Sequence, residues 1–417
     1  MKIAIIGGGA AGIMVAATLI EEEIGGEIHL FEKNTLLGKK VSISGGGRCN
    51  VTTGVTDKNT LLSKYIRGVK FLIPSFGLFS PQKVMSWFEN QGVPLKVEDG
   101  SRVFPVSDIG NDVVNVFNKM FKGKISLHLG EPVQNLRSIK TGFEIETIKE
   151  KYNFNLVVIT SGGNAYKHTG SSGDGYDFAK SCGHSVTKLG PSLSSFETKD
   201  EWVKKLSGLS FQNAKLEVPF KDDKKISVSG PFLFTHFGIS GPVTFALSAH
   251  LAFEDILPQS PIKVIFIPYA DMSFDKWNLK IKEVAHLHGK RQIKQILSEL
   301  MPKRFSEEIL NLCKIELSKT GAQLTKDERK SIAYFLSGGI LLTLVARRKG
   351  DEFVTAGGVC LDEIDKKTMQ SKLIQNLYFA GEVLDIDGLT GGFNLQSAWA
   401  TGRLAGVSIA KRIKEMK

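Results

Sequence analysis

The sequence has few cysteines and no long apolar run, and both shortages exclude whole classes of protein. Its 417 residues include four cysteines, Cys49, Cys182, Cys313 and Cys360, and no two of them form a Cys-x-x-Cys pair. A disulfide framework, a zinc ribbon and a dithiol redox couple are therefore not expected. No segment reaches the roughly 20 consecutive apolar residues of a membrane-spanning helix, and no His, Cys or carboxylate cluster has metal-ligand spacing. These shortages predict a protein of the reducing cytoplasm, without a metal site or a membrane association.

Long runs of one charge, internal repeats and low-complexity segments are missing as well. The formal net charge is +11, from 54 Lys and Arg against 43 Asp and Glu. The basic residues are dispersed, however, and become dense only between Lys280 and Arg304. A solvated helical face explains that density more simply than a nucleic-acid site does. We therefore expect no nucleic-acid partner, although the basic balance keeps a nucleic-acid-modifying enzyme open as an alternative.

The N-terminal segment has the pattern of a strand, a glycine-rich turn, a helix and a second strand. Residues 2–6 (KIAII) are apolar enough for a buried parallel strand, and the glycine-rich turn GGGAAG follows at residues 7–12. An Ala- and Leu-rich helix to about Glu23 and a second strand, EIHLFE, ending at Glu32 complete the unit. This arrangement is the dinucleotide-binding fingerprint in its proper setting.

Each part of the fingerprint has a physical role in holding a dinucleotide. Gly7 allows the tight turn, Gly9 lets the pyrophosphate approach the backbone, and Gly12 lets the helix pack closely against the strand. The helix N-terminus offers free N–H groups and the positive end of its dipole to the phosphates. Glu32, twenty residues after Gly12, is placed to accept hydrogen bonds from the adenosine ribose hydroxyls. We predict a bound dinucleotide, and the fingerprint alone leaves FAD and NAD open.

A second glycine-rich motif, near the other end of the chain, favours FAD. Residues 376–406 are typical of a strand over 376–380, an acidic residue after Gly381, a glycine-rich turn and a helix that runs to the C-terminus. In flavoproteins of the glutathione-reductase superfamily, such a strand places an acidic residue on the ribityl chain. The following helix points its N-terminus at the pyrimidine end of the flavin. Glu382 and Asp385 are both candidates for the ribityl contact, and residues 391–394 would form the helix start.

The stretch SISGGGRCN (42–50) contains three consecutive glycines, which cost backbone entropy and offer no side chain for packing. In FAD proteins of this type, the region after the second strand folds beside the pyrophosphate and under the isoalloxazine ring. The glycine N–H groups would form an anion nest, and Arg48 would add a fixed charge. We therefore interpret Gly45–Gly47 as a close approach of the backbone to the cofactor rather than as a flexible loop.

These motifs, with SRVFP (101–105), TSGGNAYKHTGSSGDGY (160–176), LFTHFGISGP (233–242) and TAGGV (355–359), resemble a known family over nearly the whole chain. It is the group of bacterial FAD-dependent oxidoreductases that includes aminoacetone oxidases and bile-acid-reducing flavoproteins. The resemblance implies non-covalently bound FAD. The predicted cofactor-binding residues are Gly7, Gly9, Ala10, Ala11, Gly12, Glu32, Lys33, Lys39, Ser44, Gly45, Gly46, Gly47, Arg48, Cys49, Asn50, Val133, Ser161, Gly162, Gly163, Gly381, Glu382, Asp385, Gly392, Asn394 and Leu395.

The resemblance also implies an interrupted flavin domain, and the pattern of the chain agrees. Short β-like segments lie between Pro191 and about Pro268, and helical spacing follows from about Phe274 to Tyr334. The predicted fold class is α/β: a discontinuous Rossmann-type FAD-binding domain with an inserted β-barrel-like part that carries a small helical part. The predicted boundaries are 1–190 and 350–417 for the FAD-binding domain, 191–272 and 334–349 for the barrel-like part, and 273–333 for the helical part.

Catalytic residues are much harder to predict than cofactor contacts. Cys49 lies in the glycine motif, where a small buried residue is a better explanation than a nucleophile, because no partner cysteine is nearby. Tyr166 and His168 lie in a glycine-rich loop after a strand, a usual place for ligand contacts, although a plain surface loop explains them equally well. His236, in the insert, is a candidate for proton transfer, with a structural histidine as the alternative.

Three functional classes follow from these observations. The leading one is an FAD-dependent oxidoreductase that transfers hydride between flavin N5 and a small organic substrate, which is an amine, an α-amino ketone or an enone. No second G-x-G-x-x-G follows a strand, so no dedicated NAD(P)H domain is visible, and oxygen and transiently bound NAD(P)H both stay open as redox partners. The alternatives are a flavin-dependent nucleic-acid-modifying enzyme and a non-catalytic flavin-binding regulator. The sequence leaves the substrate and the oligomeric state open.

Overall fold

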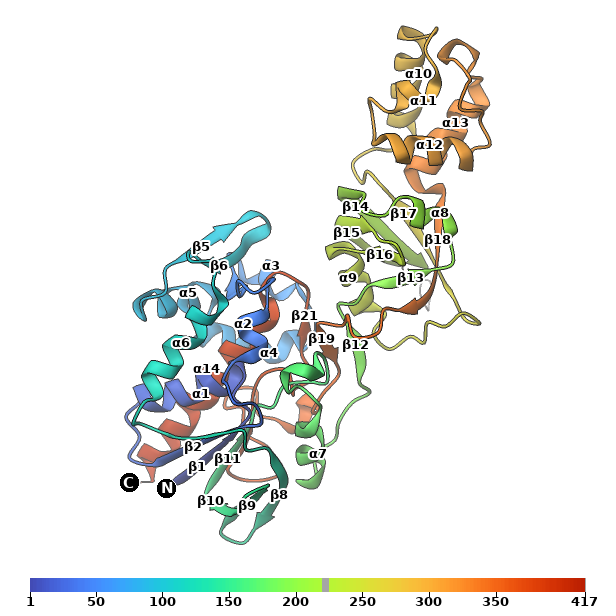
Figure 1. The fold of residues 1–417 in the computed structure, drawn as a ribbon. Helices are drawn as coiled ribbons and strands as arrows, with labels where there is room; N and C mark the ends of the chain where they lie inside the picture. Colours follow the sequence, from blue (N-terminus) through green and yellow to red (C-terminus); the bar gives the residue numbers. More distant parts are fainter. Residues whose placement is uncertain (220–224, 417) are drawn as a thin grey trace. The chain divides into compact units, whose positions relative to one another are not determined.

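The computed structural model describes residues 1–219 and 225–416, and the chain divides into two compact units (Figure 1). Unit 1 comprises residues 1–192 and 352–417, and unit 2 comprises residues 193–351. Unit 1 is therefore built from two separate stretches of the chain, and unit 2 is inserted between them.

The centre of unit 1 is a parallel sheet of five strands in the order β20-β11-β1-β2-β7. Its strands are β1 (Lys2–Ile6), β2 (Glu27–Glu32), β7 (Ser126–Leu129), β11 (Leu156–Ile159) and β20 (Leu377–Phe379). The first two have the predicted bounds. Helix α1 (Ala10–Glu21) ends two residues before the predicted limit, and Glu23, with a φ of 50°, continues into the turn before β2. From the central strand β1, the sheet continues with β2 and β7 on one side and with β11 and β20 on the other, which is the Rossmann arrangement.

The long C-terminal helix α14 (Phe393–Glu415) packs directly against α1 (Figure 1). Small residues permit this close contact. A Cβ at Gly402 would lie 2.6 Å from the Ala11 carbonyl oxygen, and one at Gly406 would lie 2.6 Å from the Thr18 Cβ atom. The last helix of the chain thus completes the layer that the first helix begins, and it does so through glycines.

Smaller elements surround this sheet in unit 1. The strands form four short sheets: β3 (Thr52–Thr53), β6 (Arg102–Pro105) and β5 (Leu95–Glu98); β4 (Tyr65–Arg67) and β21 (Asp387–Gly388); β8 (Val133–Ile139), β9 (Gly142–Thr147) and β10 (Lys151–Phe154); β12 (Gly190–Ser192) and β19 (Val354–Ala356). The helices are α2 (Lys39–Ile43), α3 (Lys58–Leu62), α4 (Val69–Leu78), α5 (Pro81–Asn90), α6 (Gly110–Phe121) and α7 (Asp174–Ser181). Two of the small sheets, β4 with β21 and β12 with β19, join the two stretches of unit 1.

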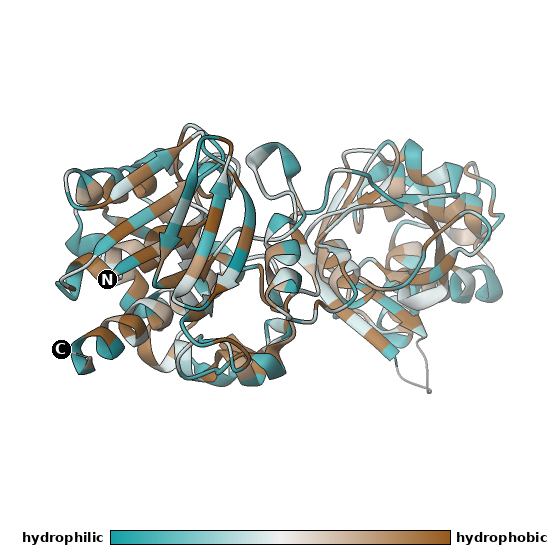
Figure 2. Cartoon of the chain, turned by 90° about the horizontal axis from the view of Figure 1, so that it is seen from below, coloured by the Kyte–Doolittle hydropathy of each residue, from teal (hydrophilic) through white to brown (hydrophobic). Residues whose placement is uncertain are grey.

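Unit 2 contains a closed antiparallel barrel in the order β13-β16-β15-β14-β17-β18. Its strands are β13 (Phe196–Thr198), β14 (Ser210–Pro219), β15 (Lys225–Phe234), β16 (Gly238–Ser240), β17 (Ile262–Ile267) and β18 (Ile340–Arg347), with helices α8 (Glu201–Lys205) and α9 (Pro242–His250) beside them. Hydrophilic and hydrophobic residues alternate along many strands of the chain (Figure 2), as a sheet with one buried face requires. Phenylalanines in tilted and edge-on arrangements, among them Phe211, Phe232 and Phe266, fill the barrel.

A helical part extends from the barrel within unit 2. It consists of α10 (Phe274–Leu287), α11 (Ile293–Leu297), α12 (Lys303–Leu312) and α13 (Lys326–Tyr334). Ser273 and Thr325 cap two of these helices through hydrogen bonds from their third residues. The predicted fold class is confirmed: a Rossmann-type domain made of two chain segments, with an inserted barrel that carries a small helical part.

Candidate cofactor site

The carboxyl end of β1 leads into α1 at the point where the strand order reverses, which is where open α/β sheets bind ligands. A Cβ at Gly7 would lie 2.7 Å from the Thr160 carbonyl oxygen, and one at Gly12 would lie 1.9 Å from the Gly7 carbonyl oxygen. A Cβ at Gly9 would meet nothing within 4 Å. The chain itself therefore requires Gly7 and Gly12, whereas Gly9 faces open space, as the predicted approach of a pyrophosphate needs.

The first turn of α1 is suited to bind an anion. No side chain caps the helix at Gly9, and no acidic residue lies in the first turn. The first amides of a helix have no acceptor within the helix and carry the positive end of its dipole. The N-terminus of α1, including the predicted contacts Ala10 and Ala11, thus has the chemistry that a pyrophosphate group requires.

Glu32, at the end of β2, is a buried carboxylate that holds the loops around it. Its Oε2 atom accepts a hydrogen bond from the Gly8 amide at 2.8 Å. Its Oε1 atom accepts hydrogen bonds from the Asn34 amide at 2.8 Å and from the Asn34 side chain at 2.6 Å. A carboxylate has about four acceptor positions, so it has capacity left for ribose hydroxyls. Glu32 binds the glycine-rich loop in this structure, and its contact with the ribose stays a prediction.

The glycine triplet adopts left-handed backbone conformations, with φ of 58°, 73° and 88° at Gly45, Gly46 and Gly47. A Cβ at Gly45 would lie 2.8 Å from Phe104, but one at Gly46 or Gly47 would meet nothing within 4 Å. The Gly47 amide donates to the Ile43 carbonyl at 3.0 Å, so this amide is already used within the protein. The predicted anion nest is therefore limited to the remaining amides of the triplet.

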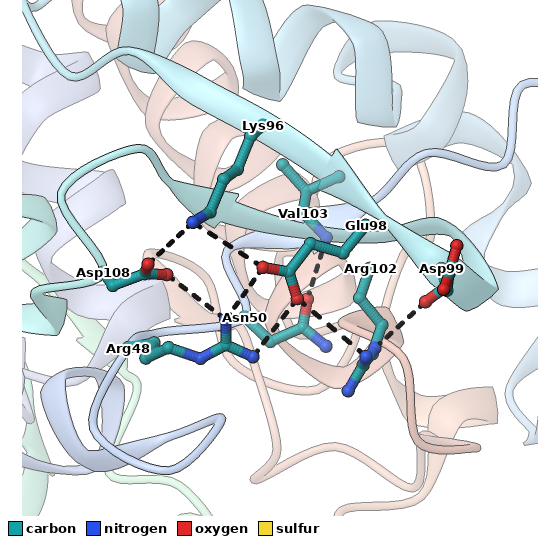
Figure 3. Close-up of polar contacts among 8 residues, drawn as sticks. All are labelled: Arg48, Asn50, Lys96, Glu98, Asp99, Arg102, Val103 and Asp108. Carbon is teal, nitrogen blue, oxygen red and sulfur yellow. Dashed lines mark hydrogen bonds and ion pairs between the residues drawn. The ribbon is translucent and has the colours of Figure 1, made fainter.

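Arg48 forms an ion-pair cluster with the neighbouring β5–β6 hairpin (Figure 3). Its guanidinium donates to Glu98 at 2.8 and 3.2 Å and to Asp108 at 3.2 Å, and it stacks on the Phe104 ring at 3.9 Å. The hydrogen bond from Arg48 lowers the pKa of Glu98, and the one from Lys96 lowers the pKa of Asp108. Two carboxylates thus compensate the charge of Arg48, which fastens the glycine loop to the hairpin. Its predicted contact with the cofactor stays a prediction.

The C-terminal motif contains two carboxylates in different situations. Glu382 accepts a hydrogen bond from the Thr355 amide at 3.0 Å with one oxygen and pairs with Lys40 at 2.8 Å with the other. Asp385 accepts a hydrogen bond from Thr187 at 3.2 Å through Oδ2, while its Oδ1 atom is buried and has no hydrogen-bond partner among residues 1–219 and 225–416. Burial raises the pKa of Asp385. Of the two candidates for the ribityl contact, Asp385 has the free buried oxygen.

The N-terminus of α14 is a second helix end without a side-chain cap. Gly392 precedes it with a φ of 87°, and a Cβ there would lie 2.1 Å from the Thr52 carbonyl oxygen. The Asn394 side chain accepts from the Gly388 amide at 2.9 Å and donates to the Gly388 carbonyl at 2.8 Å, which fixes the loop before the helix. No acidic residue lies in the first turn, so the positive end of this helix also suits an electron-rich group.

The fold brings these predicted segments into contact. A Cβ at Gly7 would lie 2.7 Å from the Ser161 Cα atom. A Cβ at Gly163 would lie 2.9 Å from Glu382 Oε1, and a Cβ at Gly381 would lie 2.7 Å from the Ala11 side chain. Ser161 Oγ is a further buried polar atom without a hydrogen-bond partner in the described ranges. The site therefore fits FAD, a dinucleotide that carries hydroxyl groups. It offers two uncapped helix ends, a glycine that faces open space, and buried oxygens without partners.

The remaining predicted contacts lie around the same loops. Lys33 binds Ser172 and Asp174, Lys39 donates to the His168 carbonyl at 2.7 Å, and Ser44 donates to the Val41 carbonyl at 2.8 Å. Val133 begins β8, and Asn50 accepts a hydrogen bond from the Val103 amide at 3.2 Å. Gly162 lies in the loop after β11, and Leu395 lies in the first turn of α14. These polar groups hold the site together, and their contacts with the cofactor stay predictions.

The four catalytic candidates fall into three situations. Cys49 is fully buried, and burial raises the pKa of its thiol to about 12, so it is protonated at neutral pH. Tyr166, with a φ of 56°, packs its ring against His168 at 5.2 Å and Phe353 at 5.7 Å within unit 1. His236 is exposed in unit 2, where its ring contacts Phe237. The geometry therefore argues against Cys49 as a nucleophile and leaves the proton-transfer role of the other three as a prediction.

Sequence reasoning missed one charged pair in this region. Asp387 is fully buried, forms a bidentate ion pair with Arg67 at 2.5 Å and accepts from Ser192 at 2.9 Å. It follows Asp385 by two residues, and it joins β4 to β21 across 320 positions of the chain. Nothing in the local sequence around Arg67 signals this partner. An acidic residue in an otherwise apolar, glycine-rich segment was the only available sign.

This fold and site define a dinucleotide-binding flavoprotein of the Rossmann type. The family model described as "HI0933-like protein Rossmann domain" matches residues 1–408, and the chain belongs to this family. The predicted family is thus confirmed. FAD is the cofactor, and the family consists of flavoprotein oxidoreductases. In the described ranges, no helix is both long enough and apolar enough to cross a membrane.

Several characterised proteins are similar over their full length. A 3-dehydro-bile acid delta(4,6)-reductase of Clostridium scindens is 27% identical, with 99% of each chain covered. Ribosomal RNA dihydrouridine synthases are 25% identical in Escherichia coli, over 95% of each chain, and 26% identical in Haemophilus influenzae, over 98% of each chain. Among solved structures, a 3-ketosteroid delta1-dehydrogenase from Sterolibacterium denitrificans superposes with a TM-score of 0.52 at 12% identity, covering 98% of this chain and 99% of that one. That likeness shows the shared fold.

Proposed function

We propose that this protein is an FAD-dependent reductase of carbon–carbon double bonds that are conjugated to a carbonyl group. The supporting observation is the full-length similarity to two differently named groups of enzymes. A delta(4,6)-reductase of a 3-dehydro steroid and a dihydrouridine synthase share one type of reaction by name, the addition of two hydrogens across such a bond. Of the three substrate classes expected from the sequence, the enone is therefore favoured over the amine and the α-amino ketone.

The reaction adds a hydride to the β-carbon of the substrate and a proton to the α-carbon. Reduced FAD supplies the hydride when bound. The uncapped N-terminus of α1 would hold the pyrophosphate of the cofactor, the N-terminus of α14 would face the electron-rich pyrimidine part of its flavin, and Asp385 would offer a buried acceptor to its hydroxyls. Tyr166, His168 and His236 remain the proposed candidates for the proton donor, because the Cys49 thiol is buried with a raised pKa. NAD(P)H is the proposed reductant that reduces the oxidised FAD again after each turnover.

The uridine of an RNA is a second candidate substrate. The similarity to two ribosomal RNA dihydrouridine synthases supports it, together with the net charge of +11. An amine oxidase that uses oxygen, as in the aminoacetone oxidases that the sequence resembles, is the competing reaction. It differs in direction, because an amine reduces the enzyme whereas an enone oxidises it.

The direction of electron flow separates these reactions. The purified FAD-loaded enzyme is reduced with NADPH without oxygen and then mixed with cyclohex-2-enone, a 3-oxo-Δ4 steroid or a uridine-containing RNA oligomer. We expect at least one of these to restore the absorbance of oxidised flavin near 450 nm, with saturated product detected by mass spectrometry. The oxidised enzyme is mixed with aminoacetone in parallel. Reduction of the flavin by aminoacetone, with no reoxidation by any unsaturated compound, would refute the proposal in favour of an oxidase.

A further inference from the structure

A cavity of about 660 Å³ lies in unit 1 between the start of α4 and the segment before β20. The charged residues of its lining are Lys70, Lys366, Lys367, Lys372, Asp362 and Asp365. Four lysines against two aspartates make this lining basic, and apolar side chains such as Phe71 and Ile364 contribute its remaining surface. The volume falls within the range of small-molecule sites, about 300 to 1,000 Å³.

The charges of this cavity are only partly compensated by the protein. Lys70, Lys366 and Lys367 are exposed, and none of their ammonium groups has a carboxylate within 4 Å in the described parts of the chain. Lys372 donates to the Asp362 carbonyl oxygen at 2.8 Å, a neutral acceptor. Asp365 accepts from the Lys367 amide at 2.7 Å and so holds the turn that presents these lysines. Two chain segments nearly 300 residues apart thus bring uncompensated positive charge to one cavity.

The backbone adds to this charge. Gly68, the residue before α4, has a φ of 79° and offers no side chain to cap the helix, and no acidic residue lies in the first turn. The Val69 and Lys70 amides are therefore at the positive end of the helix dipole, on the lining of the same cavity. Gly68 also lies against the C-terminal motif, because a Cβ there would meet Ile386 at 2.6 Å and the Asp385 carbonyl oxygen at 3.3 Å.

We propose that this cavity binds the phosphate of a nucleoside phosphate, with the lysines on the phosphate and the apolar residues against the base or sugar. The sequence has one dinucleotide fingerprint, which is assigned to FAD, so a second nucleotide would need a separate site. Two sources share this chemistry: a free coenzyme such as NADPH, and a phosphate of an RNA strand. The inference concerns binding, so it does not depend on which substrate the enzyme reduces.

The test measures binding to the full-length enzyme saturated with FAD. The probes are ADP, adenosine and a ten-nucleotide single-stranded RNA, each titrated at low and at high salt while flavin absorbance shows that FAD stays bound. The site variant replaces Lys70, Lys366 and Lys367 by alanine. The control variant replaces Lys119, Lys122 and Lys124, which lie at and after the end of α6, outside the cavity, and changes the net charge equally.

We expect the site variant to weaken the binding of ADP, RNA or both by about tenfold, since each exposed charge pair contributes up to roughly fivefold. The control variant should stay within about twofold of the wild type, and adenosine should bind at least tenfold more weakly than ADP. Weakened ADP binding identifies a free nucleotide as the source, and weakened RNA binding alone identifies the strand. Equal effects of the two variants on both probes, or no binding of either probe, would refute the site. Neither measurement requires turnover, so a failure of the proposed reduction remains a separate result.

Discussion

The two glycine-rich loops of unit 1 use the same residue for different physical reasons. In the loop after β1, Gly7 and Gly12 leave no room for a Cβ because other parts of the chain are there, and only Gly9 faces open space. In the loop after α2, Gly46 and Gly47 face open space, and their left-handed φ is what a side chain would oppose. The first loop is therefore fixed by packing around one free position. The second is a left-handed turn, and the residue that follows it, Arg48, ties it to the β5–β6 hairpin. Substitutions can separate packing, strain and contact with the ligand.

The largest effect should come from Gly12→Val. Its Cβ would lie 1.9 Å from the Gly7 carbonyl oxygen, so α1 must move away from β1 in the apoprotein as well as in the FAD complex. We expect the free energy of unfolding of the apoprotein to fall by about 3 kcal/mol or more. Thermal or urea unfolding measures this. A Gly12→Val apoprotein as stable as the wild type would show that the loop is not fixed by packing.

Gly9→Val should affect binding without affecting the apoprotein. Gly9 has a φ of −78°, which valine adopts easily, and its Cβ would meet no atom of the chain within 4 Å. We expect the melting temperature of the apoprotein to stay within a degree or two, whereas the dissociation constant for FAD rises about a hundredfold. Fluorescence titration of the apoprotein with FAD measures that constant. Unchanged affinity would mean that the pyrophosphate does not approach Gly9.

Gly46→Val should lower both the stability of the apoprotein and its affinity for FAD, each by less than the two preceding substitutions do. A φ of 73° costs a side-chain-bearing residue about 1–2 kcal/mol even where space is available, so the apoprotein should lose stability by that amount. If the backbone of Gly46 also faces the cofactor, FAD affinity should fall about tenfold further. Gly46→Ala is the matched control, because it carries most of the strain with little bulk. A valine variant that binds FAD as tightly as the alanine variant would leave strain as the only role of this glycine.

Arg48→Ala should have the smallest effect, and one that depends on pH. Its hydrogen bonds to Glu98 and Asp108 help to lower the pKa of both carboxylates. Groups with a lowered pKa in the folded state stabilise it above their unfolded pKa values of about 4. This stabilisation is lost as the pH falls through the folded values. The melting temperature of the variant should therefore be slightly below that of the wild type at pH 7, and the two should converge towards pH 3. A constant difference across this range would indicate lost stacking on Phe104 instead.

The sequence predicts the first loop better than the second. The reason is the separation along the chain between each loop and the residues that fix its conformation. The fingerprint fits within 32 consecutive residues, so its strand, turn and helix follow from local pattern, and β1 and β2 have the predicted bounds. Arg48 is held by Glu98 and Asp108, which lie 50 and 60 residues further along the chain. The hairpin that carries Glu98 was not predicted. In the local sequence Arg48 has no visible partner, so its charge is assigned to the ligand. The fold instead places the carboxylates of Glu98 and Asp108 beside it.

The two carboxylates of the C-terminal motif show the same limit. Spacing alone left Glu382 and Asp385 equivalent as ribityl contacts. Lys40, 342 positions earlier in the chain, and Thr355 occupy both oxygens of Glu382, whereas one oxygen of Asp385 stays without a partner in residues 1–219 and 225–416. Such long-range pairing is fixed by the topology, which the local pattern does not contain.

The division of unit 1 into two chain segments sets the order in which its parts can form during synthesis. Strand β11 borders the sheet until residues 377–379 arrive as β20, and α1, which also contacts α6, lacks its more extensive contact with α14 until that helix is made. The whole of unit 2, residues 193–351, leaves the ribosome in between. At about 5–20 residues per second, that interval lasts roughly 8–30 seconds. During this time the first segment carries a complete fingerprint, an unpaired sheet edge and an apolar helix α1 that is only partly covered. The nascent chain is thus most exposed to aggregation in this interval, before the residues of the second segment that complete the cofactor site have been made.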